Sequence, residues 1–466
     1  MESGKNNFCV LILAAGKGTR MHSEKPKVLQ NILEEPILFY PIEAVLGAGF
    51  RHVSAVVGYA GEQVAGWLQN SYPDVETIWQ REQLGTGHAV KIAADWWKRY
   101  DHVLILPGDT PLITSDTLRS LMERHVENNN QCTFLSFDIP DPEGYGRVIR
   151  DGLSVRIVEH KDATAEERKC REVNSGMYVF SSSALASVID DLGCENHQKE
   201  YYLPDAIPLI HKAGGRVEAF KASSHTEFHG VNDPIQMAES AECLRTRILN
   251  EAMRKGLKCM DPRSTWIGPE VVIGEDVTIE PNVQIWGKSE VGNCARIGSF
   301  SVLRGAKIGN GAALAGSVRI QDSVIGDHVT VGPFVFIREN TVLAEHVHVG
   351  RFVEIKKSVV GKSSKIPHLS YIGDTEIGTG TNIGAGTITC NYDGVKKNKT
   401  KIGSNCFIGS DTMLVAPVEL EDNAVTGAGS VITQDVPEGA LAVARARQRN
   451  IEGWHSRKQK NEGGKD

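Results

Sequence analysis

The stretch Trp266-Ile-Gly-Pro-Glu-Val-Val-Ile-Gly274 opens a region in which an aliphatic residue followed by a small one returns every six positions. The pair recurs at Ile325-Gly326 and Val331-Gly332, and the pattern continues to about Ile432. An α-helix would repeat apolar residues every three or four positions, and a half-buried strand every second position. A period of six is typical of a hexapeptide β-helix, in which short strands form the flat faces of a coil and the aliphatic residues point inward.

The regular pattern has one internal break and one end. Between Cys390 and Lys401 the segment Asn391-Tyr-Asp-Gly394 is followed by four lysines in six residues, which predicts a loop that leaves the coil. Pro437-Glu-Gly439 predicts the end of the prism. The tail from Arg445 is basic, and beyond about Trp454 we expect a solvated end without a role.

The first half of the chain has a different sequence pattern, in which short apolar runs alternate with longer segments. Aliphatic runs at 10–13, 53–57 and 103–106 predict buried parallel strands, and the segments 61–69 and 87–100 between them predict helices. This alternation indicates a doubly wound (Rossmann-like) α/β domain.

A single helix is expected to connect the two halves. Asn232-Asp-Pro234 is a helix-start signal, the apolar spacing from Ile235 to Lys255 is helical, and Gly256 is a stop. We therefore divide the chain into an α/β domain (1–234), a linker helix (235–255) and a hexapeptide-repeat domain with a basic tail (256–466).

Net charge, apolar runs and cysteine content exclude several classes of protein. The 466 residues carry a net charge of −7, which argues against nucleic-acid and anionic-membrane partners. No early apolar run is long enough for a membrane span, and no secretory signal precedes one. The nine cysteines are scattered without a Cys-x-x-Cys pair, so neither disulfides nor a zinc site are expected. These features predict a cytoplasmic protein.

A glycine-rich turn follows the first predicted strand. In Leu13-Ala-Ala-Gly-Lys-Gly-Thr-Arg-Met21 small residues let a ligand approach backbone N–H groups that face phosphates, and Lys17, Arg20 and Lys27 add positive charge. By spacing alone such a turn is a nucleotide site or a bare turn. Asp109, just past another strand, is equally a helix cap or a Mg²⁺ ligand.

Several further motifs occur in order and make a resemblance specific. They are Pro26-Lys-Val-Leu29, Gln83-Leu-Gly-Thr-Gly-His88, Gly108-Asp-Thr-Pro-Leu112, Gly144-Tyr-Gly-Arg147, Val158-Glu-His-Lys-Asp162 and Asn174-Ser-Gly176. Together with the glycine-rich turn, they resemble the sugar-phosphate nucleotidyltransferases. When the hexapeptide domain is considered with these motifs, the resemblance covers nearly the whole chain. It is to the bifunctional bacterial N-acetylglucosamine-1-phosphate uridylyltransferases/glucosamine-1-phosphate N-acetyltransferases, whose β-helix is left-handed.

The resemblance implies a nucleotide and sugar site in the first domain. Its members would be Leu13, Ala14, Ala15, Gly16, Lys27, Gln80, Gly85, Thr86, Pro107, Gly108, Asp109, Gly146, Glu159, Asn174 and Asn232. Asp109 and Asn232 would bind Mg²⁺, while Lys27 and Arg20 would neutralise phosphate charge. A sugar-1-phosphate oxygen would then attack the α-phosphorus of UTP in line, releasing pyrophosphate.

The resemblance also implies a second active site on the prism. His368, which by itself is more often a surface histidine than a catalytic one, would be the general base for acetyl transfer from acetyl-CoA. Glucosamine-1-phosphate would be bound by Arg338, Lys356, Tyr371 and Asn382, and acetyl-CoA by Ala385, Asn391, Tyr392, Ser410, Ala428 and Arg445. The family assembles as homotrimers through the β-helix. One departure is that Arg338 is followed by Glu-Asn where a Pro-Gly turn is more usual.

Two other hypotheses are compatible with part of the pattern. The chain could be a nucleotidyltransferase whose β-helix only assembles it, as in glucose-1-phosphate adenylyltransferases, although such a prism would not need His368 and Tyr371. It could instead be a non-enzymatic assembly protein, like the translation exchange-factor subunits that combine the same two domain types. The presence of Lys27, Asp109 and Asn232 argues against that alternative.

Overall fold

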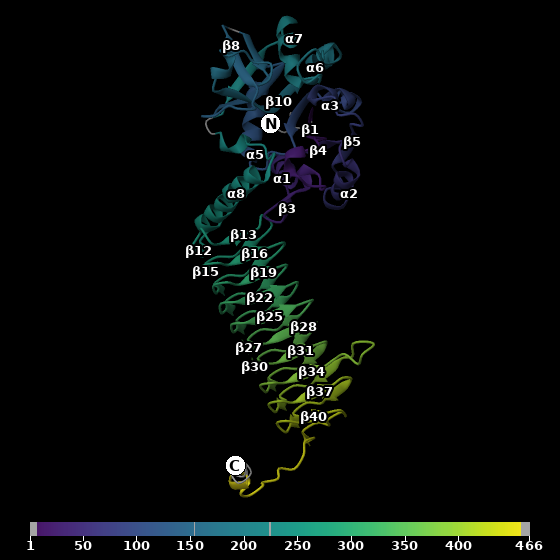
Figure 1. The fold of residues 1–466 in the computed structure, drawn as a ribbon, viewed down its shortest axis with the longest axis vertical. Coiled ribbons are helices and arrows are strands. Elements are labelled where there is room, and N and C mark those ends of the chain that lie inside the picture. Colours follow the sequence, from purple (N-terminus) through teal and green to yellow (C-terminus); the bar gives the residue numbers. More distant parts are fainter. Residues whose placement is uncertain (1–6, 153, 223–224, 458–466) are drawn as a thin grey trace, which may run out of the picture. The chain divides into compact units, whose positions relative to one another are not determined.

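The computed structural model describes residues 7–152, 154–222 and 225–457 (Figure 1). The chain divides into two compact units, Met1–Thr246 and Arg247–Asp466. Part of the predicted solvated tail, residues 458–466, lies outside the described residues. Within the described ranges, no helix is both long and apolar enough to cross a membrane.

The described residues of the N-terminal unit form a nine-stranded mixed sheet. Its main path runs β11-β7-β10-β6-β1-β4-β5, with β8 paired to β10 and β9 paired to β8. The strands are β1 (Phe8–Ala14), β4 (His52–Val57), β5 (Glu76–Trp79), β6 (His102–Pro107), β7 (Cys132–Asp138), β8 (Arg147–Asp151), β9 (Ser154–Val158), β10 (Glu172–Ser181) and β11 (Val217–Lys221). The predicted parallel strands are confirmed as β1, β4 and β6, but β10 runs antiparallel to both β6 and β7.

Helices cover both faces of this sheet, as a doubly wound fold requires. Successive residues of β1 point to opposite faces, so Val10 belongs to one apolar core and Leu11 to the other. The first core is closed by α1 (Phe39–Gly47), α2 (Gly61–Ser71) and α5 (Ser115–Glu127). The second is closed by α3 (Thr86–Ile92), α4 (Ala94–Trp97), α6 (Ser182–Val188) and α7 (Ala206–Lys212).

The helix predicted over 87–100 is in fact two short helices, α3 and α4, which meet at Ala93. The backbone of Ala93 leaves the helical region there. The break lets Trp97 turn into the core, where its indole N–H donates to the carbonyl of Val90 at 2.8 Å.

The linker helix is α8 (Pro234–Arg254). It begins as predicted, because the Asp233 carboxylate accepts a hydrogen bond from the backbone N–H of Gln236 at 2.9 Å. It ends before Gly256, whose φ of 104° is a conformation that favours glycine.

The C-terminal unit is the predicted left-handed parallel β-helix of hexapeptide repeats, with three stacked parallel sheets (Figure 1). The 11-stranded sheet runs from β12 (Lys258–Cys259) to β41 (Leu441–Ala442), the 10-stranded sheet from β13 (Trp266–Ile267) to β40 (Val431–Ile432), and the 9-stranded sheet from β14 (Val272–Ile273) to β38 (Val418–Leu420). The aliphatic residues of the six-residue pattern form one continuous buried core.

The prism continues past the end that the sequence predicted. Pro437-Glu-Gly439 forms a turn rather than a terminus, because β41 follows it and pairs with β39 (Val425–Thr426). The predicted loop after Cys390 is confirmed: the chain leaves the coil, Tyr392 and Lys397 form an isolated bridge, and β35 (Thr400–Ile402) resumes the 9-stranded sheet.

Candidate functional sites

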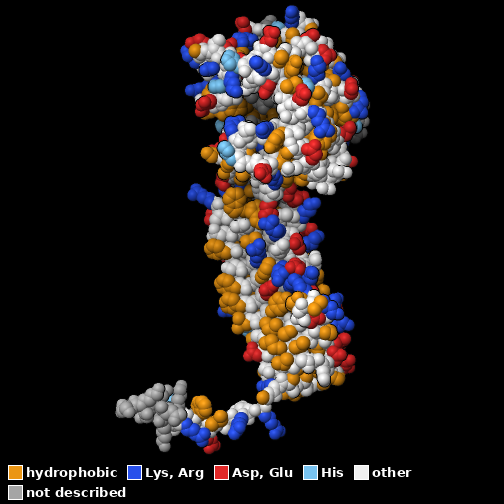
Figure 2. All heavy atoms as spheres, turned by 45° about the vertical axis from the view of Figure 1, so that its right-hand side comes forward, with side chains coloured by type: hydrophobic (Ala, Val, Ile, Leu, Met, Phe, Trp, Pro, Cys, Tyr) orange, Lys and Arg blue, Asp and Glu red, His pale blue; other side chains and the backbone are white. Residues whose placement is uncertain are grey.

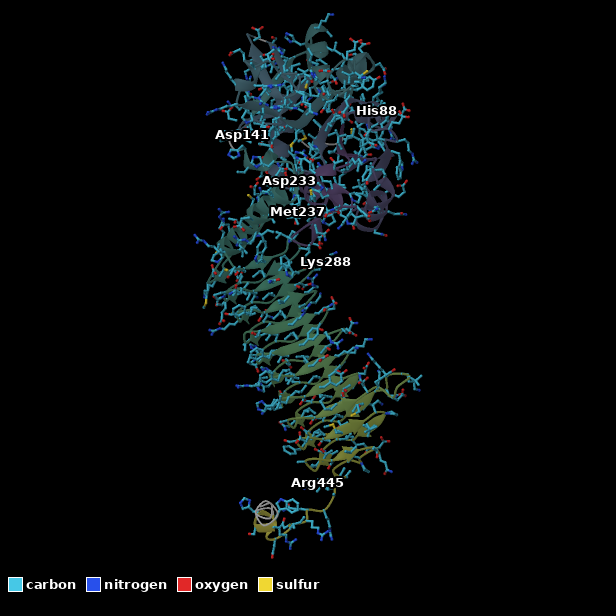
Figure 3. All side chains as sticks on the ribbon, in the orientation of Figure 1. His88, Asp141, Asp233, Met237, Lys288 and Arg445 are labelled. Carbon is cyan, nitrogen blue, oxygen red and sulfur yellow. The ribbon has the colours of Figure 1, made fainter. Side chains whose placement is uncertain are left out.

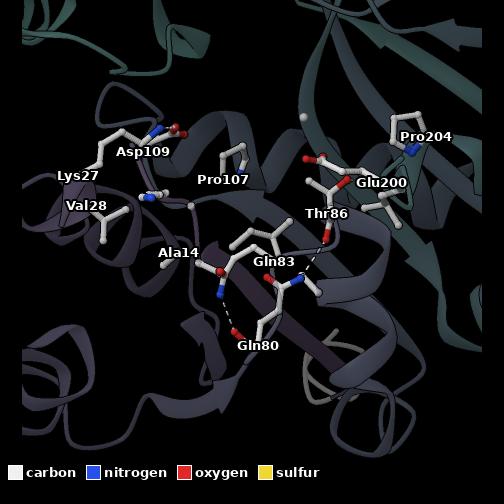
Figure 4. A pocket seen from close by; sticks show the side chains of 18 of the residues that line it. Ala14, Lys27, Val28, Gln80, Gln83, Thr86, Pro107, Asp109, Glu200 and Pro204 are labelled. Carbon is white, nitrogen blue, oxygen red and sulfur yellow. Dashed lines mark hydrogen bonds and ion pairs between the residues drawn. The ribbon is translucent and has the colours of Figure 1, made fainter. Parts of the chain in front are cut away.

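A cavity of about 520 Å³ opens at the carboxyl ends of β1 and β6 (Figure 4). The chain runs from β1 to β4 on one side and returns to β6 on the other, so this is the switch point of the sheet, where open α/β folds bind ligands. The cavity is lined by Leu13, Ala14, Ala15, Gly16, Lys17, Lys27, Val28, Gln80, Gln83, Gly85, Thr86, Ala89, Pro107, Asp109, Glu159, Asn174, Gly176, Tyr178, Glu200, Leu203 and Pro204.

The glycine-rich turn forms one wall of this cavity. A Cβ on Gly16 would meet no protein atom within 4 Å, so the residue faces open space. Gly18 differs, because its φ of 59° is left-handed and a Cβ there would collide with the side chain of Lys27. Gly18 thus lets Lys27 lie against the turn and reach the cavity.

Lys27 joins the two residues predicted to bind a metal. Its ammonium forms an ion pair with Asp109 and donates a hydrogen bond to the Asn232 side-chain oxygen at 3.1 Å. The side chains of Lys27 and Asp109 are only 11% and 21% exposed. Two oxygens that converge on one cation can also hold a hard divalent ion, and Mg²⁺ completes its shell with water and phosphate oxygens. The donor set therefore fits Mg²⁺, although the described residues hold no cluster of three or more His, Cys, Asp or Glu side chains around a common point.

The opposite wall carries two glutamine side chains (Figure 4). Gln80 is buried, and its amide nitrogen donates to the carbonyl of Gly85 at 3.1 Å. Gln83 in turn donates to the backbone carbonyl of Gln80 at 3.0 Å. Thr86 accepts a hydrogen bond from the backbone N–H of Leu203 at 3.1 Å. Fixed amides of this kind present hydrogen-bonding groups suited to the edge of a planar base.

Acidic and amide side chains occupy the third side. Burial raises the pKa of Glu159 to about 6, and the nearby carboxylates of Asp205, Asp162 and Glu200 add to the effect. Asn174 donates to the Tyr178 hydroxyl at 2.5 Å, while its own oxygen accepts from the backbone N–H of Gly176 at 3.1 Å. This side of the cavity offers acceptors for the hydroxyl groups of a sugar.

Most of the residues predicted for this site lie together, and four lie outside the lining. Asn232 is the partner of Lys27, and Gly146 approaches Glu159 so closely that a Cβ would lie 3.2 Å from its carboxylate. Gly108 donates its backbone N–H to Leu13 at 2.9 Å. Arg20 is exposed on the turn and does not line the cavity.

The sequence prediction missed part of the lining. Tyr178 follows Asn174 along β10, while Glu200 and Leu203 come from a loop that no motif marked. Glu200 joins this region because the backbone N–H of Tyr201 donates to the carbonyl of Leu84 at 2.8 Å. Only tertiary contacts of this kind place Glu200 and Leu203 beside the cavity.

A cluster of cations lies at the carboxyl ends of neighbouring strands in the 10-stranded sheet of the prism. β25 (Val335–Arg338) pairs with β28 (Glu354–Lys356), which places Arg338 beside Lys356. Arg338 binds the Glu354 carboxylate through Nε at 3.0 Å and Nη2 at 2.7 Å. Lys397, from the loop that leaves the coil, comes close to Lys356, and the proximity of this second amino group lowers the pKa of Lys397. Positive charge is therefore concentrated where a phosphate was predicted.

Tyr371 reaches this cluster from the next strand, β31 (Tyr371–Gly373). Gly373 is paired with Lys356, and a Cβ on it would collide with the Tyr371 hydroxyl and the Asn391 amide. Asn391 donates to Asp374 at 2.6 Å and to the Tyr371 hydroxyl at 3.4 Å. The structure thus brings Tyr371 and Asn391 together with the Arg338–Lys356 cluster.

His368 lies at a different corner of the prism, at the end of β30 (Lys365–His368), with an exposed side chain. Backbone hydrogen bonds stack this corner coil by coil. The backbone N–H of Gly386 donates to the carbonyl of His368 at 3.3 Å. In the following coils, the N–H of Asp411 donates to the carbonyl of Ala385 at 2.7 Å, and that of Gly429 to the carbonyl of Ser410 at 2.8 Å. Arg445, labelled beyond the last coil in Figure 3, continues the column with a 2.8 Å hydrogen bond to the carbonyl of Ala428. Four of the residues predicted for acetyl-CoA therefore follow His368 in one column.

Two predicted members of the second site lie apart from these groups. Asn382 begins β33 (Asn382–Ile383) in the 11-stranded sheet, whereas Tyr371 belongs to the 10-stranded sheet. Tyr392 is 61% exposed, and its hydroxyl donates to the carbonyl of Gly394 within the loop at 2.7 Å.

Known proteins match nearly the whole chain. Residues 10–192 match the MobA-like NTP transferase domain, 262–366 the GMPPB C-terminal domain, and 399–434 the hexapeptide repeat of succinyl-transferase. The bifunctional protein GlmU of Carboxydothermus hydrogenoformans is 47% identical over 446 residues, covering 95% of this chain and 99% of its own. Those of Caldanaerobacter subterraneus subsp. tengcongensis (47%; 95% and 96% covered) and Streptomyces avermitilis (42%; 96% and 94% covered) are similar.

The chain belongs to the GlmU family. It is therefore a bifunctional transferase, with a nucleotidyltransferase half and a hexapeptide-repeat acyltransferase half. Both alternatives, a prism that only assembles the enzyme and a non-enzymatic assembly protein, are set aside because the identity to GlmU relatives extends through both halves.

Proposed function

We propose that the switch-point cavity transfers the uridylyl group of UTP to N-acetylglucosamine-1-phosphate, with residues 1–234 as its domain. The observation that carries this proposal is the Lys27–Asp109–Asn232 cluster beside the glycine-rich turn. The amides of Gln80 and Gln83 would read the base, and Glu159 and Asn174 would hold the sugar.

Catalysis at this site would rest on positioning and charge neutralisation. The sugar-phosphate oxygen attacks the α-phosphorus, the bond to the bridging oxygen breaks, and pyrophosphate leaves. Lys27 would bind phosphate oxygens, while Arg20, on the exposed part of the turn, would meet the leaving group. Asp109 and Asn232 would hold Mg²⁺, which supplies further neutralisation of the phosphates when bound.

The prism domain, residues 256–466 after the linker helix 235–255, would acetylate glucosamine-1-phosphate. Arg338 and Lys356 would bind the phosphate, with Tyr371 and Asn382 contacting the sugar. Its amine attacks the thioester carbonyl of acetyl-CoA, His368 accepts the amine proton, the C–S bond breaks, and the CoA thiolate leaves and takes up a proton. Ala385, Asn391, Tyr392, Ser410, Ala428 and Arg445 would bind acetyl-CoA. The acetylated product is the substrate of the first domain.

We further propose that the prism assembles as a homotrimer. The corner that carries His368 also presents the apolar residues Phe300, Phe334, Phe352 and Leu369 on its stacked coils, with Ser317 between the first two; these four residues, which we call the ridge, are 52–65% exposed. Figure 2 shows hydrophobic side chains along the prism surface. Large exposed apolar patches mark association sites. Association would also explain why Asn382 and Tyr371 lie on different sheets of one chain, since a neighbouring copy could bring them into one site.

Replacing Phe352 with glutamate tests this assembly. We expect the variant to lose trimers and to lose most acetyl transfer, because a buried unpaired charge on the ridge opposes association. Light scattering and the two activity assays measure the effect, with uridylyl transfer as the internal control. A Phe352→Glu protein of unchanged trimeric mass would contradict the ridge as the interface.

The overall function is tested by mass spectrometry of the products formed from glucosamine-1-phosphate, acetyl-CoA and UTP. We expect N-acetylglucosamine-1-phosphate first and UDP-N-acetylglucosamine next, with free CoA and pyrophosphate. Omission of acetyl-CoA should stop both products. A UDP-sugar formed only when the acetylated sugar phosphate is supplied would show that the prism does not acetylate.

The raised pKa of Glu159 predicts a pH dependence of sugar binding. Its carboxylate accepts hydrogen bonds when ionised, so the KM for N-acetylglucosamine-1-phosphate should rise as pH falls through about 6. At pH 5 about one carboxylate in ten remains ionised, which predicts a roughly tenfold rise in KM. The substrate phosphate titrates in the same range, so Glu159→Gln is the comparison: it keeps the substrate's titration and should lose the additional rise. Identical profiles for both proteins would exclude Glu159 from sugar binding.

A further inference from the structure

Glu339 lies inside the cation cluster of the prism. Its carboxylate binds Arg338 Nη1 at 2.5 Å and approaches the ammonium groups of Lys356 at 3.3 Å and Lys357 at 3.8 Å. Burial would raise the pKa of Glu339, but the hydrogen bond to Lys356 and the attraction of these cations hold it below its usual range. A carboxylate of the protein itself is therefore already paired with the cations that the proposed function assigns to the substrate phosphate.

The backbone at this corner places Glu339 there. In the coils above and below, a single left-handed residue, Asp322 or Lys357, separates the end of the strand from a buried serine. After Arg338 there are two left-handed residues, Glu339 and Asn340, before the buried Thr341. The extra residue widens the corner and directs an acidic side chain toward the cluster.

The two carboxylates on Arg338 are held differently. Glu354 is part of β28, where pairing with Phe336 fixes its backbone, and its carboxylate accepts two hydrogen bonds from Arg338. Glu339 lies on a turn outside any strand, its side chain is about as exposed as that of Glu354 (39% against 37%), and its ion pairs within the described residues are with the three cations only. Glu339 can therefore rotate into solvent when another anion arrives, whereas Glu354 remains.

We propose that Glu339 is an internal counterion that competes with the phosphate of the sugar phosphate for Arg338 and Lys356. This inference rests on the proposed acetyl-transfer site. A phosphate dianion displaces the single carboxylate, since charge-assisted bonds strengthen with the charge of the acceptor. Glu339 thus weakens substrate binding and keeps small monoanions out of the cluster. It acts on the free protein, so it should change KM and leave kcat unchanged.

The test compares Glu339→Gln and Glu339→Ala with the wild type in acetyl transfer. We expect the KM for glucosamine-1-phosphate and the inhibition constant of inorganic phosphate to fall together, about tenfold, at constant kcat. Alanine covers the case in which the glutamine oxygen still binds Arg338. The matched control is Glu345→Gln, because Glu345 forms an ion pair with Lys362 at another corner and should change neither constant.

An unchanged or raised KM in both Glu339 variants, with normal acetylation by the wild type, would overturn the inference and leave the proposed function intact. Failure of the wild type to acetylate would overturn the proposed function instead. In that case calorimetry with inorganic phosphate still decides the inference: tighter binding in Glu339→Ala, lost in Arg338→Ala, supports competition, and equal affinity refutes it.

Discussion

Replacing Asp109 with alanine is expected to reduce uridylyl transfer by about 10³-fold or more, while acetyl transfer persists. Asp109 is the only carboxylate in contact with Lys27 among the described residues, and it lies at the switch point beside the glycine-rich turn. Without it, the proposed Mg²⁺ site loses its charged ligand, and the phosphates of UTP lose a large part of their neutralisation. Both activities should be measured on the same preparation.

Two comparisons sharpen this prediction. Asp109→Asn keeps the size of the side chain and removes only its charge, so it should lose nearly as much activity as alanine and require more Mg²⁺. Asp116→Ala removes an exposed carboxylate that pairs with Arg119 on α5, and it should leave both activities unchanged. If Asp109→Ala lost acetyl transfer as well while remaining folded, the two-site description would fail.

Replacing His368 with alanine should have the opposite effect: acetyl transfer falls by about 10²- to 10⁴-fold, the usual contribution of a general base, and uridylyl transfer is retained. His368 is exposed at the head of the column formed by Ala385, Ser410 and Ala428, the residues proposed to bind acetyl-CoA. The loss should appear in kcat, because the phosphate contacts proposed for Arg338 and Lys356 would remain.

The matched control is His348→Ala. His348 is also exposed on the 11-stranded sheet, where it contacts Thr330 at 2.7 Å, and it lies outside the column. Its replacement should leave acetyl transfer unchanged. Acetylation at the wild-type rate by His368→Ala would remove the histidine from the role of base, whereas equal losses in both variants would indicate a defect of the prism itself.

Local signals in the sequence were sufficient for most of the fold. The six-residue pattern specifies the prism because each aliphatic residue must point inward, and Asp233 with Pro234 starts the linker helix because both act within one turn. The break at Ala93 and the antiparallel β10 were not predicted, since they depend on which surfaces are available to Trp97 and β6. The strand β41 was missed because it lies beyond the last repeat of the six-residue pattern, and only its pairing with β39 shows that the coil continues.

The candidate sites divide in the same way. The sequence by itself determined which side chains are candidates for phosphate and metal binding, because the glycine-rich turn, Asp109 and the lysines are marked by short motifs. Only the tertiary structure decided that Lys27 bridges Asp109 and Asn232, residues 82 and 205 positions from it along the chain. Only the structure, too, showed Glu339 folded onto Arg338 and Lys356. Motifs record local backbone needs, whereas which charges neutralise one another depends on distances that the chain acquires on folding.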